Sequence, residues 1–285
     1  MAKKQKIDSQ EVGLEIGLYF FKYFLKTEYL HYGYFIDGLE TDILNLAKAQ
    51  ENYARFLLEQ IPQGVKSILD VGGGSGKFAR ELIQQGYEID FVSPSRLLNE
   101  YASIVLGERV AIHTKKFEDL DLNKKFDLVL FSESFQYIPI DDAIGNAKKH
   151  LRPEGYILIC DFFQRDDVPG KSALGGGHKW HDWIEKLPKH ELIEIKNQDI
   201  TQETAPTIDL VNSMTLEVLQ PIWRILFMLG EAYYPKLMKF SRWKYKKKLE
   251  KIENKHFKGE RNGANFIKYK KYMMYLFRIQ SVRGE

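Results

Sequence analysis

The sequence predicts an α/β protein with a doubly wound sheet of seven mostly parallel strands, an N-terminal helical cap and a helical insertion before the last strand. Two observations carry this prediction. From residue 67 onward, short apolar runs alternate with segments of helical periodicity, which is the rhythm of a parallel sheet with crossover helices. The first run, "SILDV" at 67–71, leads directly into a turn with four glycines in five positions, as strands do where a ligand approaches the backbone.

Each element follows from a local pattern. Short apolar runs with β-branched side chains predict buried strands. Helical segments that end at Gly86 and Gly107 fit the preference of glycine for the position after a helix. The expected strands are 67–71, 87–93, 109–114, 126–132, 156–163, 191–200 and 272–280, and the expected helices between them are 77–86, 95–107, 141–151 and 179–187.

The helical patterns outside this rhythm divide the chain into four parts. Residues 12–60 show helical spacing, and the segment 12–26 has apolar residues on more than one of its faces, which predicts that much of it is buried. A second helical stretch, broken near Pro221 and Pro235, separates the last two strands. We therefore expect a cap at 1–64, an α/β domain at 65–200, a helical insertion at 201–265 and a returning strand within 266–285.

Composition narrows the functional classes. The net charge of +3 is too balanced to indicate nucleic-acid binding, and a single cysteine, Cys160, excludes an intrachain disulfide and a cysteine-based metal cluster. The histidines show no metal-binding spacing, so we expect no metal. The N-terminal residues lack an apolar signal core, and the run 16–25 carries Lys22 and is shorter than a membrane span. We therefore expect a cytoplasmic protein without a transmembrane helix.

The glycine turn, "DVGGGSGK", does not fit either phosphate-binding pattern. A P-loop needs four residues between its glycines and Ser or Thr after its lysine, whereas three residues separate Gly72 from Gly76, and Phe78 follows Lys77. The dinucleotide fingerprint Gly-x-Gly-x-x-Gly would start at Gly72 and Gly74 but needs a third glycine where the chain has Lys77. The pattern that does fit is Asp-x-Gly-x-Gly-x-Gly.

The segment "LDVGGGSGKFARELI" resembles motif I of the class I S-adenosylmethionine-dependent methyltransferases. This resemblance implies a Rossmann-like methyltransferase fold and S-adenosyl-L-methionine as the cofactor. The glycines then let the backbone pass close to the amino-acid tail and the ribose of the cofactor, while a carboxylate faces its ammonium group or an ordered water. The residues implied here are Asp70, Gly72, Gly73, Gly74 and Gly76.

The resemblance extends over about residues 60–165. At the end of the second strand, "DFVSPS" has Phe91 where the family carries the acid that holds the ribose, and Asp90 lies one place earlier. Strand alternation turns Asp90 to the other side, so Ser93 or Ser95 is the expected substitute. After the third strand, "KFEDLDL" resembles the adenine-binding turn, which implies that Phe117 and Glu118 lie beside the adenine, with Lys116 in place of the usual first acid.

Three further segments supply candidates for chemistry. "FSESFQYIP" resembles motif IV and implies Ser132 and Glu133 at the ligand-binding end of the fourth strand. "EYLHYGYF" is similar to the segment that caps the cofactor in methyltransferases of small lipophilic molecules, where Tyr32 suits a sulfonium methyl. His178 follows the glycines of "LGGGH", where a histidine can serve as general base. The catalytic candidates are therefore His178, Glu133 and Tyr32.

The sequence thus indicates methyl transfer from S-adenosylmethionine to a small, lipophilic acceptor by in-line displacement, with a base needed only where the acceptor loses a proton. In this fold, an insertion such as 201–265 commonly roofs the substrate pocket. The basic stretch 236–261 is open to two interpretations: a helix face exposed to solvent, or a surface that contacts an anionic membrane. Two alternatives stay open: a cofactor-binding protein without transferase activity, and a membrane-lipid-modifying enzyme. The acceptor atom and the oligomeric state are also open.

Overall fold

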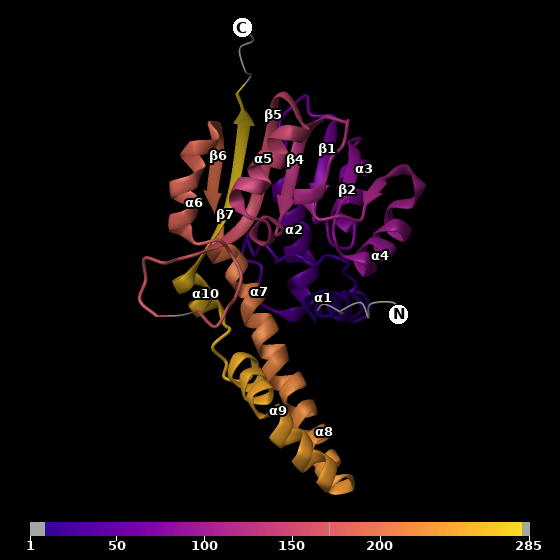
Figure 1. Cartoon of the computed structure of the whole chain (residues 1–285), viewed down its shortest axis with the longest axis vertical. Coiled ribbons are helices and arrows are strands. Elements are labelled where there is room, and N and C mark those ends of the chain that lie inside the picture. Colours follow the sequence, from indigo (N-terminus) through magenta and orange to yellow (C-terminus); the bar gives the residue numbers. More distant parts are fainter. Residues whose placement is uncertain (1–8, 171, 281–285) are drawn as a thin grey trace.

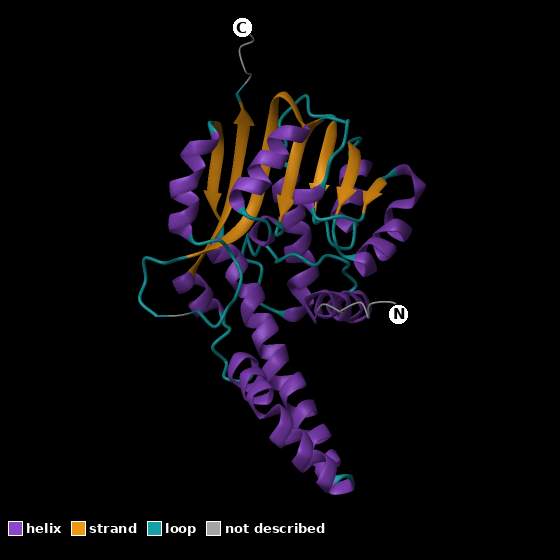
Figure 2. Cartoon of the chain, in the orientation of Figure 1, coloured by secondary structure: helices purple, strands orange, loops and turns teal. Residues whose placement is uncertain are grey.

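The computed structural model describes residues 9–170 and 172–280. Seven strands form one sheet in the order β3-β2-β1-β4-β5-β7-β6, and helices cover both of its faces (Figure 1). All pairs are parallel except those of β7, which runs antiparallel between β5 and β6. The predicted doubly wound, mostly parallel sheet is therefore confirmed, and β7 is its exception (Figure 2).

The strands match the expected ranges closely, with β5 starting earlier. The strands are β1 (Ser67–Val71), β2 (Glu88–Val92), β3 (Ala111–His113), β4 (Phe126–Ser132), β5 (Leu151–Gln164), β6 (Leu192–Asp199) and β7 (Lys270–Ile279). The helices are α1 (Ser9–Phe20), α2 (Leu46–Leu58), α3 (Lys77–Gln84), α4 (Arg96–Leu106), α5 (Ile140–His150), α6 (Trp180–Lys186), α7 (Thr201–Met214), α8 (Gln220–Tyr233), α9 (Pro235–His256) and α10 (Gly263–Tyr269).

Alternation along the strands divides the core into two layers. Leu128 and Leu130 of β4 face a cluster that includes side chains of α2, α3 and α4. Val129 and Phe131 point to the opposite face, where α5 and α6 pack, and Trp183 of α6 is completely buried there. Both faces of the central strands β1 and β4 are therefore packed against helices, so the ends of the strands are left as the place for a ligand.

The N-terminal segment is more exposed than its apolar sequence predicts. Within α1 and the π-helical turn Phe21–Leu25 that follows it, Leu18 is buried, whereas Ile16, Tyr23 and Phe24 are 60–71% exposed. The expectation of a largely buried helix was wrong because apolar residues around a helix do not specify what covers them. The predicted cap residues 1–8 lie outside the described residues.

The insertion between β6 and β7 contains α7 to α10. α7 packs on the sheet, where Ala205 and Ile208 join the core. A π-helical turn, Thr215–Leu219, connects it to α8, so the chain does not break at Pro221, whereas it does turn before Pro235. α8 and α9 then form a hairpin that projects away from the sheet (Figure 1). The hairpin lies outside the cavity described below, so the expectation that the whole insertion roofs the pocket does not hold for α8 and α9.

Within the described ranges, no helix has the length and apolar character needed to span a bilayer. The same residues contain no group of three or more histidine, cysteine, aspartate or glutamate side chains placed to hold a metal ion. Cys160 is a buried free thiol in the core beside α2.

Candidate active site

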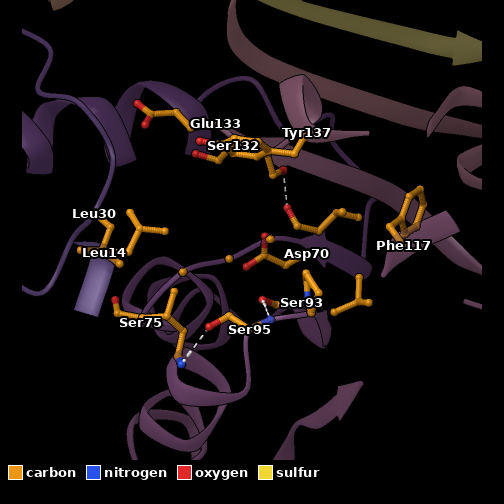
Figure 3. Close-up of a pocket in the computed structure, with 18 of the residues that line it drawn as sticks. Leu14, Leu30, Asp70, Ser75, Ser93, Ser95, Phe117, Ser132, Glu133 and Tyr137 are labelled. Carbon is orange, nitrogen blue, oxygen red and sulfur yellow. Dashed lines mark hydrogen bonds between the residues drawn. The ribbon is translucent and has the colours of Figure 1, made fainter. Parts of the chain in front are cut away.

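A cavity of about 410 Å³ opens at the carboxyl ends of β1, β2 and β4 (Figure 3). Five segments line it: the glycine turn after β1, the turn after β2, the short helix after β3, the end of β4, and residues 29–31 from the loop before α2. Leu14 of α1 closes one side. The cavity thus lies where ligands bind in open α/β sheets, and residues far apart in sequence meet there.

The glycine turn needs its glycines for space as well as for conformation. Gly72 has a φ of +74°, and a Cβ on it would lie 2.5 Å from the Cβ of Ser134. A Cβ on Gly73 would lie 2.2 Å from Oδ2 of Asp70. Gly74 and Gly76 also have positive φ, and Gly74 lines the cavity. Backbone therefore forms this wall, and any side chain at Gly72 or Gly73 would displace the residues behind it.

Asp70 is the main electrostatic feature of this wall. It is the last residue but one of β1, lines the cavity and is 1% exposed. Within the described part of the chain, neither of its carboxylate oxygens has a hydrogen-bond partner. Burial raises the pKa of Asp70 to about 7. A buried carboxylate without donors is costly unless a ligand supplies them, so this residue fits a cofactor that carries an ammonium group.

The second strand departs from the pattern of the family, as the sequence indicated. Phe91 is completely buried in the core. The carboxylate of Asp90 instead accepts bonds from Nζ of Lys124 at 2.5 Å and Nε2 of His113 at 3.0 Å, and Asp90 does not line the cavity. Ser93 does line it. At the end of β2 the cavity therefore has the hydroxyl group of Ser93 in its lining and not the carboxylate of Asp90.

The adenine-binding turn predicted by resemblance also borders the cavity. Phe117 is 2% exposed and lies in the 3₁₀ turn Phe117–Asp119. Glu118 and Lys116 line the cavity on either side of Phe117. Ser95 also lines the cavity, and its hydroxyl caps α4 by accepting from the backbone N–H of Leu98. These residues were predicted as one site, and the structure brings them together around one space.

Glu133 follows β4 with a φ of +57°. Its Oε1 accepts two hydrogen bonds, from the backbone N–H of Tyr32 at 2.7 Å and from the hydroxyl of Tyr272 at 2.6 Å. Among the described residues, no hydrogen bond reaches Oε2. Burial raises the pKa of Glu133 to about 8, although both of these hydrogen bonds act to lower it.

A chain of hydroxyls supports Glu133 from behind. Tyr272 contacts the hydroxyl of Tyr53 at 3.1 Å, and Tyr53 lies 3.3 Å from Oγ of Ser132, which lines the cavity. Tyr272 comes from β7 and Tyr53 from α2. Glu133 is therefore held directly by Tyr272 of β7 and indirectly by Tyr53 of α2, which is the kind of support that a reactive group requires.

Two of the catalytic candidates lie outside the cavity lining. The ring of Tyr32 packs among Phe162, Phe266 and Tyr272, and its backbone rather than its ring serves Glu133. His178 bonds through Nε2 to the carbonyl oxygen of Phe135 at 3.0 Å. Neither residue is among those that line the cavity, so their direct roles in catalysis stay predictions.

His31 lines the cavity and was not predicted. Its ring stacks on Tyr53 at 4.3 Å, and its Nδ1 lies 2.8 Å from the carbonyl oxygen of Tyr32. A carbonyl oxygen only accepts, so Nδ1 carries the proton and Nε2 is the acceptor. Within the described residues Nε2 is buried without a partner, and burial lowers the pKa of His31 to about 4. The sequence signal was the position of His31 in "EYLHYGYF", next to Tyr32, which was predicted to cap the cofactor.

The fold, the glycine turn and the unpaired Asp70 together define a methyltransferase of class I. A family model described as the methyltransferase domain matches residues 45–203, which is more than half of the chain. The chain belongs to this family: it is an S-adenosylmethionine-dependent methyltransferase, and S-adenosylmethionine is its cofactor. The alternative of a cofactor-binding protein without transferase activity is therefore set aside.

Known proteins resemble this chain at low identity. An uncharacterized methyltransferase of Staphylococcus carnosus (strain TM300) is 22% identical over 56% of this chain and 79% of that protein. A ubiquinone biosynthesis O-methyltransferase of Paramagnetospirillum magneticum (strain ATCC 700264 / AMB-1) is 23% identical over 55% of this chain and 66% of that protein. Several other curated relatives are matched over only 32% of this chain and 33–41% of their own length.

The likeness to solved structures concerns the fold. The cyclopropane synthase MmaA2 from Mycobacterium tuberculosis superposes with a TM-score of 0.64 over 97% of this chain and 100% of that chain. Its sequence identity is 16%. The present chain therefore shares the fold of that protein over nearly all of its length.

Proposed function

We propose that the enzyme transfers the methyl group of S-adenosylmethionine to a small, lipophilic acceptor whose accepting group loses a proton to Glu133. The observation that carries this proposal is the state of Glu133: a half-buried carboxylate on the cavity wall, with Oε1 held by two donors. When bound, the cofactor supplies a methyl group on a sulfonium centre, open to in-line attack. The residues of the chain must then place the acceptor and manage its proton.

Glu133 is suited to accept a proton. Its pKa of about 8 lies close to neutral pH, which is the range in which general bases are most effective. Tyr32 and Tyr272 hold Oε1, and this leaves Oε2 to approach the acceptor. Neutral His31 provides a second acceptor on the same cavity through Nε2.

The cofactor is proposed to occupy the half of the cavity built by the glycine turn. Asp70 would meet its ammonium group, and the backbone at Gly72, Gly73 and Gly74 would pass beside its tail. Ser93 would take the ribose hydroxyls, with Phe117 and Glu118 beside the adenine. Gly76 supports the turn from behind, since a Cβ there would lie 3.1 Å from Cβ of Ala102.

Support for a lipophilic acceptor comes from the lining and from relatives. The cavity is bordered by the largely apolar side chains of Leu14, Leu30, Tyr137 and Ile138. An apolar acceptor would therefore find apolar contacts there. Relatives are named for ubiquinone biosynthesis, and a structural neighbour is named a cyclopropane synthase. Both names describe enzymes that act on lipophilic molecules.

The test uses the variant Glu133→Gln with a panel of prenylated phenols and unsaturated lipids, and it measures transfer of labelled methyl into the organic phase. We expect kcat to fall by about a hundredfold or more, as for loss of a general base, while cofactor affinity measured by calorimetry stays unchanged. The matched control is Glu154→Gln, an exposed glutamate that also has positive φ. Full activity of Glu133→Gln would refute the role of Glu133.

A further inference from the structure

The projecting hairpin of α8 and α9 is the largest feature that methyl transfer does not explain. Neither helix contains a buried residue. The two helices contact each other, with the guanidinium of Arg242 over the ring of Phe227 at 5.6 Å and paired with Glu231 at 2.6 Å. The hairpin thus holds itself together while it extends away from the sheet (Figure 1).

One face of α8 carries apolar side chains that nothing in the described chain covers. Their spacing of three, one, three and four residues places them on one side of a helix, and they are 45–74% exposed. We call this set the α8 stripe: Ile222, Ile225, Leu226, Leu229 and Tyr233. Such a stripe normally faces a core, so its exposure marks a surface that binds an external apolar partner.

The same hairpin concentrates positive charge. Gln220–His256 holds ten lysines and arginines against three glutamates. The hairpin therefore has a net charge of +7, more than the +3 of the whole chain, and the rest of the chain is net acidic. Over the part of the chain that is described, ion pairs engage Arg242 and Lys246 of these ten, so most of the charge faces solvent.

We propose that the α8–α9 hairpin docks on the surface of an anionic lipid bilayer. The α8 stripe enters the boundary between headgroups and acyl chains, and the lysines of α9 contact the anionic headgroups. Tyr233 and Trp243, which is 76% exposed, are residue types that favour this depth. Charge complementarity selects this occupant over a second copy of the chain, because two copies would bring two hairpins of net charge +7 together.

The position of the hairpin relates docking to the cavity. The hairpin and α1 both lie beyond the carboxyl ends of β1, β2 and β4, the edge that carries the cavity (Figure 1). α1 exposes Ile16 and Tyr19 and contributes Leu14 to the cavity wall. Docking would therefore turn the cavity edge toward the lipid. The inference itself does not depend on the acceptor or on the role of Glu133.

Sedimentation with vesicles tests the proposal, using phosphatidylcholine with and without phosphatidylglycerol. We expect the protein to sediment with the anionic vesicles, to stay in solution with phosphatidylcholine alone, and to be released by salt. Each lysine near an anionic surface contributes a factor of about five in affinity, so Lys246→Glu/Lys247→Glu/Lys248→Glu should lose about a hundredfold or more. Ile225→Ser/Leu229→Ser should lose about tenfold by removing buried apolar area.

Two matched variants serve as controls, each with a thermal unfolding curve to confirm folding. Leu44→Ser/Ile104→Ser changes apolar residues that are 80% and 82% exposed outside the hairpin, and it should bind as the wild type does. The second control, Lys48→Glu/Lys149→Glu/Lys189→Glu, reverses the charge of three exposed lysines outside the hairpin. This variant should also bind the vesicles as the wild type does.

Three results would overturn the proposal. The first is no sedimentation with anionic vesicles at low salt. The second is equal loss of binding in the hairpin variants and their controls. The third is a lipid-free dimer that Ile225→Ser/Leu229→Ser separates into monomers, because this would assign the α8 stripe to a second copy of the chain.

Discussion

Replacing Asp70 by asparagine should stabilise the protein while it removes cofactor binding. Asp70 is 1% exposed, and both of its carboxylate oxygens lack a hydrogen-bond partner among the described residues. Burial raises its pKa from 3.8 to about 7. In the unfolded chain the same group ionises near its ordinary pKa, so the native state binds an extra proton between these two values. Stability therefore falls as pH rises through this window.

The size of the effect follows from the shift. Relative to low pH, a change of about three pKa units lowers the free energy of unfolding by about 4 kcal/mol at pH 8 and by about 2 kcal/mol at pH 5. Asparagine is neutral and removes this cost. With 285 residues, the entropy of unfolding is about 0.6 kcal/mol/K, so 4 kcal/mol raises Tm by about 7 °C. The gain should be about half as large at pH 5.

The assay is thermal unfolding at pH 5 and pH 8, with and without S-adenosylhomocysteine. Asp70→Asn should melt higher without ligand and should lose the ligand-induced rise in Tm. Asp161→Asn is the matched control, because Asp161 is also buried with a pKa raised to about 7 but accepts bonds from Gln136 and Phe162. Its gain should be smaller, since the amide group of asparagine replaces a carboxylate oxygen that accepts hydrogen bonds, and a donor of Gln136 or Phe162 then loses its acceptor. An Asp70→Asn protein with unchanged Tm at both pH values and an intact ligand response would refute this reasoning.

Two further predictions concern the same cavity. Activity should rise with pH through about 8, where Glu133 becomes ionised. In Tyr272→Phe the inflexion of the pH–rate profile should move to higher pH, because the variant lacks a hydrogen-bond donor that favours the carboxylate. An inflexion at the same pH would mean that another group titrates. Gly73→Ala should lose cofactor affinity by tenfold or more in calorimetry, because its Cβ would lie 2.2 Å from Asp70. Gly145→Ala, with nothing within 4 Å of the added Cβ, should bind normally, and equal affinity of both variants would contradict the steric argument.

The sheet could be predicted from the sequence because its signal is local. Strands such as Phe126–Ser132 are apolar on both faces, and this pattern belongs to buried parallel strands. The direction of the insertion could not be predicted in the same way. Its apolar residues fit a lid, a core or an external surface equally well, since periodicity identifies a face and not its partner. The insertion 201–265 was therefore expected to roof the substrate pocket, whereas Ile222 and Leu229 within it are exposed and lie outside the cavity lining.

The candidate site also has a part that the local sequence predicts and a part that depends on long-range contacts. The glycine turn and Asp70 follow one another in sequence, so their spacing alone indicated a shared wall. Alternation along β2 also predicted that Asp90 turns away, and its bonds to Lys124 and His113 show the partners that keep it there. The support of Glu133 by Tyr272 joins residues 139 positions apart. A contact of this range depends on how β7 enters the sheet, and no local pattern contains that information.

The titratable groups of the cavity share one physical property. Burial raises the pKa of Asp70 to about 7 and that of Glu133 to about 8, and it lowers the pKa of His31 to about 4. Each shift favours the neutral form, so burial reduces the charge of these three groups near pH 7. A cationic ligand reverses this balance for a carboxylate, because it favours the ionised form. The protein thus maintains an unfavourable arrangement that a cation can relieve at Asp70, while a weakly charged wall near Glu133 and His31 suits an apolar acceptor.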